Sequence, residues 1–296
     1  MLHSFSGQPR GIAIDTVNAE IIVAGQNGDI VVFDINANGA AAPKRTIDGG
    51  GDYQGVHVDP VDGEIFVASR GNPCTVEVYN RLASGTVAPL RVLSLGEDPR
   101  GVFVDIAAGE LYVTRPDQVL VFARTASGTA VPLRTITPAP PIGDLSQVTI
   151  DGASGELVVA NHEADAIRIW PASANGAIDP TRSIIGAATL LDSPRGVVVC
   201  PGTGEYIVPN RNGGALIFHA STASGNAAPV RTLTGPATQL DSPRFVAVTG
   251  LCGLAPPPPP PAPSATAVPA LGLPAIGLLS ALLGILGSGW LRRRRG

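Results

Sequence analysis

The chain has 296 residues, of which 44% are hydrophobic, 4% aromatic and 15% charged, and it holds 36 Gly and 28 Pro. This much Gly and Pro without a Gly-x-y period excludes collagen, argues against long helices, and favours short strands joined by tight turns. Four of the 20 basic residues are Arg292, Arg293, Arg294 and Arg295, so 16 basic residues face 24 acidic ones elsewhere, and we expect no nucleic-acid binding.

A five-residue apolar segment recurs along the chain at steps of 44, 46, 46, 49 and 49 residues. Its copies are residues 11–15, 55–59, 101–105, 147–151, 196–200 and 245–249. Five residues after each of the first five copies a Glu opens a second apolar run, and these are Glu20, Glu64, Glu110, Glu156 and Glu205. Two apolar runs around a short turn predict a hairpin in each repeat.

A third apolar run follows in each repeat and ends on an aromatic residue. These residues are Phe33, Tyr79, Phe122, Trp170 and Phe218, which we expect to be equivalent and buried between repeats. An Ala-Ser/Asn-Gly turn comes next, and a Pro-x-Arg element then opens a fourth run. Because Pro cannot donate a ladder hydrogen bond, this fourth strand is expected at the outer edge of its sheet.

Four short strands in every 44 to 49 residues is the period of a β-propeller blade. The recurring Gly-Val-x-Val-Asp, Gly-Glu-hydrophobic and hydrophobic-x-Val-Phe patterns of residues 2–249 resemble those of the NHL family of propellers, although Gln147 replaces a Gly and Cys200 an Asp. We predict an all-β fold, in which residues 1–254 form a β-propeller of four-stranded antiparallel blades. The repeats start near residues 10, 54, 100, 146, 195 and 244.

The two ends of the repeat array predict five complete blades and half of a sixth. Residues 2–7 align with a fourth strand and residues 245–249 with a first strand, so a blade shared by both ends would hold two of its four strands. Either the ring is imperfectly closed or sequence upstream of Met1 is missing.

The residues after the array have the composition of a linker and a membrane segment. Residues 255–267 are rich in Pro and predict an extended spacer. The 24 residues 268–291 carry no charge and are long enough to cross a hydrocarbon layer of about 30 Å as a helix, so we predict a transmembrane tail at 268–296. Because basic residues stay on the cytoplasmic side, the terminal Arg cluster places the propeller outside the membrane.

The order of a short Pro motif, an apolar span and a terminal Arg cluster resembles the PEP-CTERM and IPTL-CTERM sorting tails of bacterial exosortase substrates. The motif consists of Val268, Pro269, Ala270 and Leu271. The resemblance implies an exosortase-type partner, export to the cell envelope, anchoring, and then release or surface attachment; a simple membrane anchor is the alternative. Export requires a signal peptide, and residues 1–10 have no apolar core, so we expect the true start upstream of Met1.

Three cysteines fit an exported protein with few cross-links. Cys200 ends the first strand of the fifth repeat, and Cys252 lies three residues beyond the matching position of the sixth, so these two are the candidate disulfide. Cys74 is expected to be an unpaired thiol.

The sequence places seven arginines in the loops that join strand four to strand one and strand two to strand three, which share one face of a propeller. They are Arg10, Arg70, Arg100, Arg115, Arg195, Arg211 and Arg244. Guanidinium groups near a channel mouth can clamp the carboxylates of a ligand. The alternative is internal pairing that ties the blades together, with Asp52, Asp98, Asp192 and Asp241 of the same linkers as the partners.

The channel-facing positions offer little for catalysis. The middle residues of the innermost strands are Ala13, His57, Phe103, Thr149, Val198 and Ala247, which contain no three-ligand zinc pattern. The Asp of the hairpin turn recurs in four repeats and is expected to bond nearby amides rather than a metal. We therefore predict no metal, no cofactor and no enzyme, but a binding module for an acidic exopolysaccharide or an envelope protein. A metal-dependent hydrolase or lyase of the propeller lactonase type and a purely structural surface scaffold are the alternatives.

Overall fold

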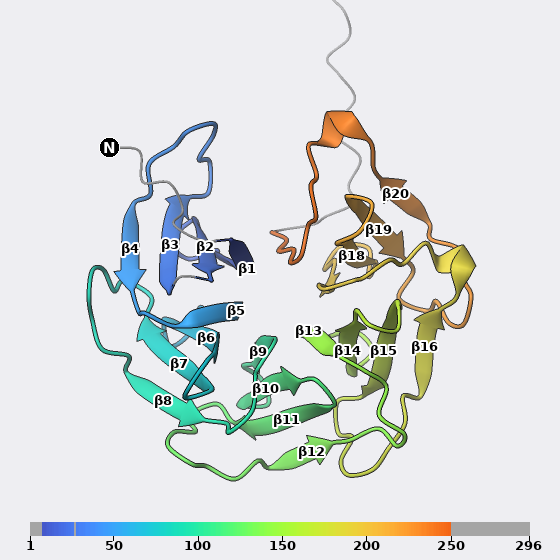
Figure 1. The fold of residues 1–296 in the computed structure, drawn as a ribbon, viewed down its shortest axis with the longest axis horizontal. Coiled ribbons are helices and arrows are strands. Elements are labelled where there is room, and N and C mark those ends of the chain that lie inside the picture. Colours follow the sequence, from blue (N-terminus) through green and yellow to red (C-terminus); the bar gives the residue numbers. More distant parts are fainter. Residues whose placement is uncertain (1–7, 27, 250–296) are drawn as a thin grey trace, which may run out of the picture. The chain divides into compact units, whose positions relative to one another are not determined.

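The computed structural model describes residues 8–26 and 28–249. Their strands form five four-stranded sheets, which stand around a common centre with the first strand of each sheet innermost (Figure 1). Neighbouring strands within each sheet are antiparallel. The described residues contain no α-helix, only the short 3-10 turns η1 (Ala187–Thr189) and η2 (Pro236–Thr238). The predicted all-β propeller of four-stranded antiparallel blades is confirmed.

Each blade takes four consecutive strands of the chain. Blade 1 consists of β1 (Pro9–Asp15), β2 (Glu20–Gly25), β3 (Asp29–Asp34) and β4 (Arg45–Asp48). Blade 2 consists of β5 (Asp52–Asp59), β6 (Glu64–Arg70), β7 (Thr75–Asn80) and β8 (Arg91–Ser94). Blade 3 consists of β9 (Val102–Asp105), β10 (Glu110–Arg115), β11 (Gln118–Ala123) and β12 (Arg134–Ile136). Blade 4 consists of β13 (Leu145–Asp151), β14 (Glu156–Asn161), β15 (Ala166–Pro171) and β16 (Arg182–Ile185). Blade 5 consists of β17 (Val198–Val199), β18 (Tyr206–Asn210), β19 (Ala215–His219) and β20 (Arg231–Leu233).

The hairpin between the first and second strands is closed by its Asp. In blade 1 the Oδ1 atom of Asp15 accepts hydrogen bonds from the backbone N–H groups of Val17 at 2.9 Å and Asn18 at 3.2 Å. Asp59 does the same in blade 2, with bonds of 2.8 and 3.1 Å. This is the expected turn device, in which a short side chain satisfies amides that no ladder partner reaches.

The apolar core is divided among the interfaces between blades. Between blades 1 and 2, for example, Ile22, Ile30 and Ile47 pack with Tyr53 and Tyr79. Fourth strands reinforce these interfaces through parallel bridges to the Ala-Ser/Asn-Gly turn of the next blade. The bridges are Ile47 to Gly85, Leu93 to Gly128, Ile136 to Gly176 and Ile184 to Gly225. Leu233 holds the corresponding place in blade 5, with no following blade among the described residues, and it is 47% exposed.

The strand register corrects one predicted equivalence. In blade 4 the residue after the hairpin Glu pairs with the aromatic residue, as Leu157 with Trp170, but in blade 5 Tyr206 pairs with His219. The equivalence of Phe218 was therefore wrong by one residue. Because neighbouring side chains of a strand point to opposite faces, Phe218 packs with Cys200 instead.

The prediction that all five aromatic residues are buried was wrong for the first of them. Phe33 is only half-buried, whereas Trp170 is fully buried. The aromatic side chain packs against the preceding blade, as Tyr79 does against blade 1, and no described blade precedes blade 1.

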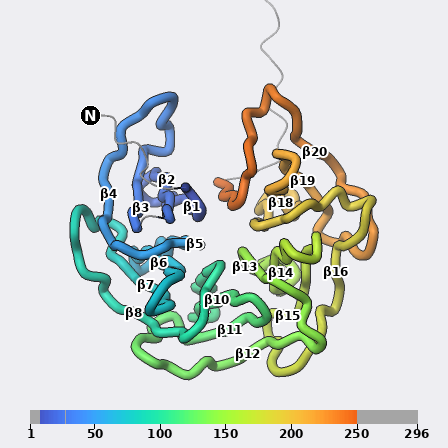
Figure 2. Tube along the Cα trace, in the orientation of Figure 1, coloured from blue at the N-terminus to red at the C-terminus, as the bar shows by residue number. Residues whose placement is uncertain are grey.

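The predicted first strand of a sixth blade was also wrong, since residues 245–249 form no strand. An innermost strand has one ladder partner in its own blade, the second strand, and the described residues provide none here. The segment still returns toward the centre between blades 5 and 1 (Figure 2), and its residues Val246 and Val248 pack on blade 5. The predicted strand at residues 2–7, the linker at 255–267 and the tail at 268–296 lie outside the described residues. Within the described residues no helix has the length and apolar character to span a membrane.

Candidate functional site

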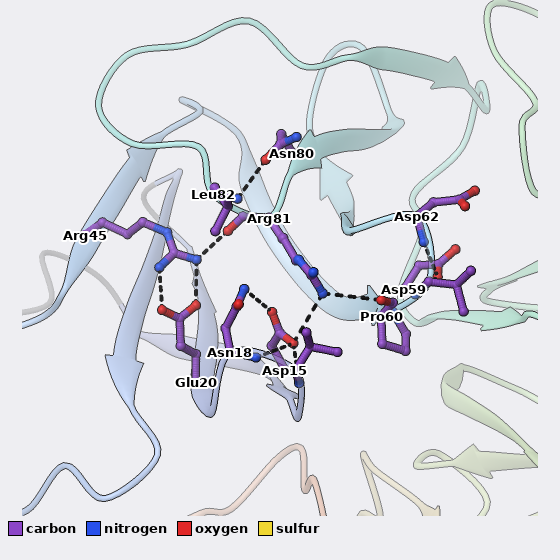
Figure 3. A network of polar contacts seen from close by, with 12 residues as sticks. Asp15, Asn18, Glu20, Arg45, Asp59, Pro60, Asp62, Asn80, Arg81 and Leu82 are labelled. Carbon is purple, nitrogen blue, oxygen red and sulfur yellow. Dashed lines mark hydrogen bonds and ion pairs between the residues drawn. The ribbon is translucent and has the colours of Figure 1, made fainter.

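The arginines of the Pro-x-Arg elements are held by the hairpin glutamates. In blade 1 the Nη1 and Nη2 atoms of Arg45 each donate to the Glu20 carboxylate at 2.7 Å, and Nη2 also donates to the carbonyl oxygen of Arg81 in blade 2 (Figure 3). The same pairing recurs in blades 2 to 5, between Arg91 and Glu64, Arg134 and Glu110, Arg182 and Glu156, and Arg231 and Glu205. The hydrogen bonds from Arg45 lower the pKa of Glu20. Each of these Arg–Glu pairs connects two strands of one blade, and we call the pair a clasp.

One group of carboxylates in the described part of the chain has metal-ligand spacing. Oxygen atoms of Asp59, Asp62 and Glu64 lie within 4.8 Å of one another. Arginines already neutralise them: the Nη1 and Nη2 atoms of Arg124 lie 2.5 Å from Asp59 and from Asp62, and Nη1 of Arg91 lies 2.5 Å from Glu64. A cation in this group would have to displace both guanidinium groups, so the group does not suit a metal.

The central channel contains a cavity of about 200 Å³. All six predicted channel residues line it, namely Ala13, His57, Phe103, Thr149, Val198 and Ala247. The imidazole of His57 packs edge-on against Phe103, with 4.8 Å between ring centroids. Burial lowers the pKa of His57 to about 4, so the ring is neutral at pH 7. No carboxylate is among the described residues that line this cavity, and the charge of Asp59 opposes the effect of burial on the His57 pKa only in part.

His57 makes stability depend on pH. An unfolded His titrates near 6.5, so between pH 6.5 and about 4 the unfolded chain binds a proton that the folded chain does not. The free energy of unfolding is therefore expected to fall with decreasing pH across this window, by up to about 3 kcal/mol. Urea titrations of the wild type and His57→Gln at several pH values measure it. A variant whose stability falls as steeply as that of the wild type would contradict the assignment.

Four of the seven predicted arginines have a carboxylate partner. The pairs are Arg10 with Asp52 at 3.9 Å, Arg70 with Asp98 at 3.0 Å, Arg100 with Asp144 at 3.1 Å, and Arg115 with Glu97. Asp144 and Glu97 were not among the predicted partners. Asp144 was detectable in the sequence, because it lies three residues before the first-strand motif, as Asp52 and Asp98 do in their repeats.

The other three arginines, Arg195, Arg211 and Arg244, have no hydrogen-bonded or ion-paired carboxylate within the described ranges. Asp192 accepts a hydrogen bond from Asn212 at 2.8 Å, and Asp241 one from Ser242 at 3.1 Å. Internal pairing is thus right for Asp52 and Asp98 and wrong for Asp192 and Asp241.

The unpaired arginines repel one another. Burial, followed by the charges of Arg244 and Arg211, lowers the pKa of Arg195 to about 10. Burial and the charges of Arg211 and Arg10 likewise lower the pKa of Arg244. The Nε atom of Arg195 is buried without a hydrogen-bond partner. This group of partly desolvated cations is therefore a region of positive potential on an acidic protein.

A cavity of about 560 Å³ lies beside this group, between blade 1 and the segment at 241–245. Three arginines and one carboxylate residue line its polar side, namely Arg10, Arg211, Arg244 and Asp241, and Ile12 and Phe245 contribute apolar surface. We call Arg195, Arg211 and Arg244 together with this cavity the arginine site.

Two of the three cysteines, Cys74 and Cys200, lie within the described residues. Cys200 is fully buried and disulfide-bonded, whereas its predicted partner Cys252 lies outside the described residues. Cys74 is a free thiol whose Sγ donates to the carbonyl oxygen of Gly71 at 2.9 Å. The predicted sorting residues are also outside the described residues, namely Val268, Pro269, Ala270, Leu271, Arg292, Arg293, Arg294 and Arg295.

No protein-family model and no curated protein matches the chain. Among solved structures, a chain of the crystal structure of a nidogen/laminin complex is similar, with a TM-score of 0.62, 16% identity, and coverage of 82% of this chain and 85% of that chain. The β-propeller domain of Cps50 (Swd1) from Myceliophteria thermophila is similar with a TM-score of 0.58, 13% identity, and coverage of 83% and 77%. At such identities the likeness shows the fold alone, and that fold is a β-propeller, here with five blades.

Proposed function

We propose that this protein is a non-catalytic binding module whose arginine site takes an acidic ligand. The observation that carries the proposal is that Arg195, Arg211 and Arg244 are partly buried beside one another and form no ion pair with a carboxylate of the described residues, although other arginines of the same face do. Partly buried cations that repel one another are stabilised strongly when a bound ligand supplies negative charges beside them.

A polymer with a carboxylate on each sugar suits this site. The cavity beside the arginines presents several guanidinium groups and some apolar surface, which match the carboxylates and the ring faces of an acidic polysaccharide. A surface protein with an acidic segment would use the same groups. The similar chain in a nidogen/laminin complex accords with a binding role for a propeller.

The cellular setting is part of the proposal. The repeat pattern resembles NHL propellers and residues 268–296 resemble an exosortase sorting tail, which supports an exported protein of the bacterial cell envelope. In this arrangement the propeller lies outside the inner membrane, and the terminal Arg cluster stays cytoplasmic until an exosortase-type enzyme processes the tail.

Calorimetric titration of the full-length chain with oligogalacturonate at low salt tests the ligand class. We expect Arg195→Gln to weaken binding about tenfold or more, which is about 1.4 kcal/mol. The matched control is Arg231→Gln, which removes one positive charge from an exposed clasp and is expected to change the affinity less than about twofold.

The melting temperature distinguishes a ligand-binding role of the arginines from a structural role. Arg195→Gln removes a cation that repels Arg244 and Arg211, so we expect an unchanged or raised melting temperature. Absence of any binding to oligogalacturonate, or equal losses in Arg195→Gln and Arg231→Gln, would refute the polyuronate ligand. A lowered melting temperature without a detectable ligand would favour the structural scaffold.

A further inference from the structure

Glu77 lies outside the arginine site and places a carboxylate at a strand position where no other blade has one. In the other blades its register position holds Val31, Leu120, Arg168 and Ile217. Among the glutamates of the described residues, Glu77 is the half-buried one for which no basic partner is found. A carboxylate taken out of water is costly unless hydrogen bonds or a cation compensate it.

Two buried tyrosines hold one oxygen of this carboxylate. The hydroxyl groups of Tyr53 and Tyr79 each donate to Oε2 of Glu77 at 2.7 Å, and the two hydroxyl oxygens lie 3.1 Å apart. Burial and the neighbouring Glu77 raise the pKa of both tyrosines, which therefore remain donors. Among the described residues, Oε1 accepts a hydrogen bond only from the hydroxyl of Thr75, at 3.4 Å. One carboxylate oxygen is saturated and the other can accept further donors.

A cavity of about 400 Å³ lies against Glu77. The hydroxyl-bearing residues Ser69 and Thr75 line it, Thr75 being the one in contact with the carboxylate, and Val87, Pro89 and Val92 form an apolar wall. Two other charged residues line it, but Arg70 is paired with Asp98 and Asp52 with Arg10.

Glycines allow the backbone to pass close over the tyrosines. A Cβ atom at residue 49 would lie 1.9 Å from the Tyr53 hydroxyl oxygen, and one at residue 51 would lie 2.4 Å from Oγ of Ser69. A side chain at Gly49 would displace the tyrosine hydroxyl groups that bind Glu77, and one at Gly51 would displace the Ser69 hydroxyl group that lines the cavity. The absence of a side chain at Gly49 and at Gly51 thus keeps these hydroxyl groups in place.

We propose that this cavity binds a primary alkylammonium group, such as that of a lysine side chain or a free amine. An ammonium group has three protons and no acceptor, so it can donate to Oε1 of Glu77 and to the hydroxyl oxygens of Ser69 and Thr75. The alkyl chain then lies along Val87, Pro89 and Val92. A guanidinium group fits less well, because its preferred bidentate contact requires both carboxylate oxygens and Oε2 is occupied.

The test is independent of the arginine site. The full-length chain is titrated with 1,5-diaminopentane and with the peptide acetyl-Ala-Lys-Ala-amide, which separate a free amine from a lysine in a chain. We expect saturable binding of at least one probe and no binding of uncharged 1,5-pentanediol. Glu77→Gln keeps an oxygen acceptor for the tyrosines but removes the charge, and should weaken binding about tenfold or more.

Two further variants serve as a control for charge and as a test that leaves Glu77 unchanged. Glu163→Gln removes an exposed glutamate charge and is expected to leave the affinity unchanged. Val87 lies on the cavity wall and is 37% exposed, so Val87→Lys places an ammonium group there and leaves the tyrosines intact. This ammonium group should compete with the added amine even if Glu77→Gln is unstable. The proposal is overturned if neither amine binds, or if the wild type, Glu77→Gln and Val87→Lys bind the amines equally.

Discussion

Replacing Trp170 by Ala is expected to lower the free energy of unfolding by about 3 kcal/mol or more. The indole is fully buried, packs with Tyr112 and Val121 of blade 3, and donates from Nε1 to the carbonyl oxygen of Ile178 at 3.2 Å. The variant loses apolar contacts across a blade interface, leaves a cavity, and strands a carbonyl acceptor. Urea unfolding followed by circular dichroism measures the change.

Phe33→Ala is the control for this prediction within the same protein. Phe33 occupies the same register position in blade 1 but is half-buried. With less apolar surface removed from water, its truncation should cost about 1 kcal/mol. Equal losses at the two positions would mean that burial against the preceding blade does not stabilise the aromatic residue.

Arg182→Ala is expected to cost about 2 to 3 kcal/mol. The Nη2 atom of Arg182 donates to Glu156 at 2.5 Å and to the Tyr206 hydroxyl at 3.0 Å, and Nη1 donates to the carbonyl oxygen of Ala223 at 2.7 Å. The variant removes bonds to two blades and leaves the half-buried Glu156 carboxylate without its cation. Urea unfolding at pH 7 measures the loss.

Arg231→Ala tests the same clasp without a following blade. Arg231 pairs with Glu205, but its side chain is 47% exposed, so its removal should cost less than about 1 kcal/mol. A loss as large as that of Arg182→Ala would show that the contact with the next blade adds nothing.

The clasp also has an expected pH dependence. The hydrogen bond from Arg182 lowers the pKa of Glu156 below its ordinary value of 4.5. The stabilisation is therefore complete above pH 4.5 and is lost as the pH falls through the lower folded-state value. The difference in unfolding free energy between the wild type and Arg182→Ala should accordingly narrow in acid.

The sequence predicted only some of the carboxylate partners of the arginines. Asp52 and Asp98 lie three residues before their first-strand motifs and pair with Arg10 and Arg70. Asp192 and Asp241 are each one residue further away, because an extra Ser follows them in the chain. Ser193 and Ser242 adopt positive φ angles of 52° and 50°. The longer linker carries the carboxylate away from the neighbouring guanidinium group. The extra Ser was readable in the sequence, but its effect on pairing was not.

The sequence by itself determined the repeat, the order of the strands, the hairpin turns and the edge position of the Pro-x-Arg strand. These features follow from local strand pairing and from the period-two alternation of side chains, and this pattern occurs in all five repeats. Only the tertiary structure decided that Phe218 is out of register with the other aromatic residues, that residues 245–249 form no strand, and that Arg195 and Glu77 form no ion pair with another described residue. The register of Phe218 depends on strand pairing within blade 5, and the missing strand at 245–249 reflects the lack of a ladder partner among the described residues. The surroundings of Arg195 and Glu77 depend on which side chains meet in space, and the repeat pattern of the chain does not encode this.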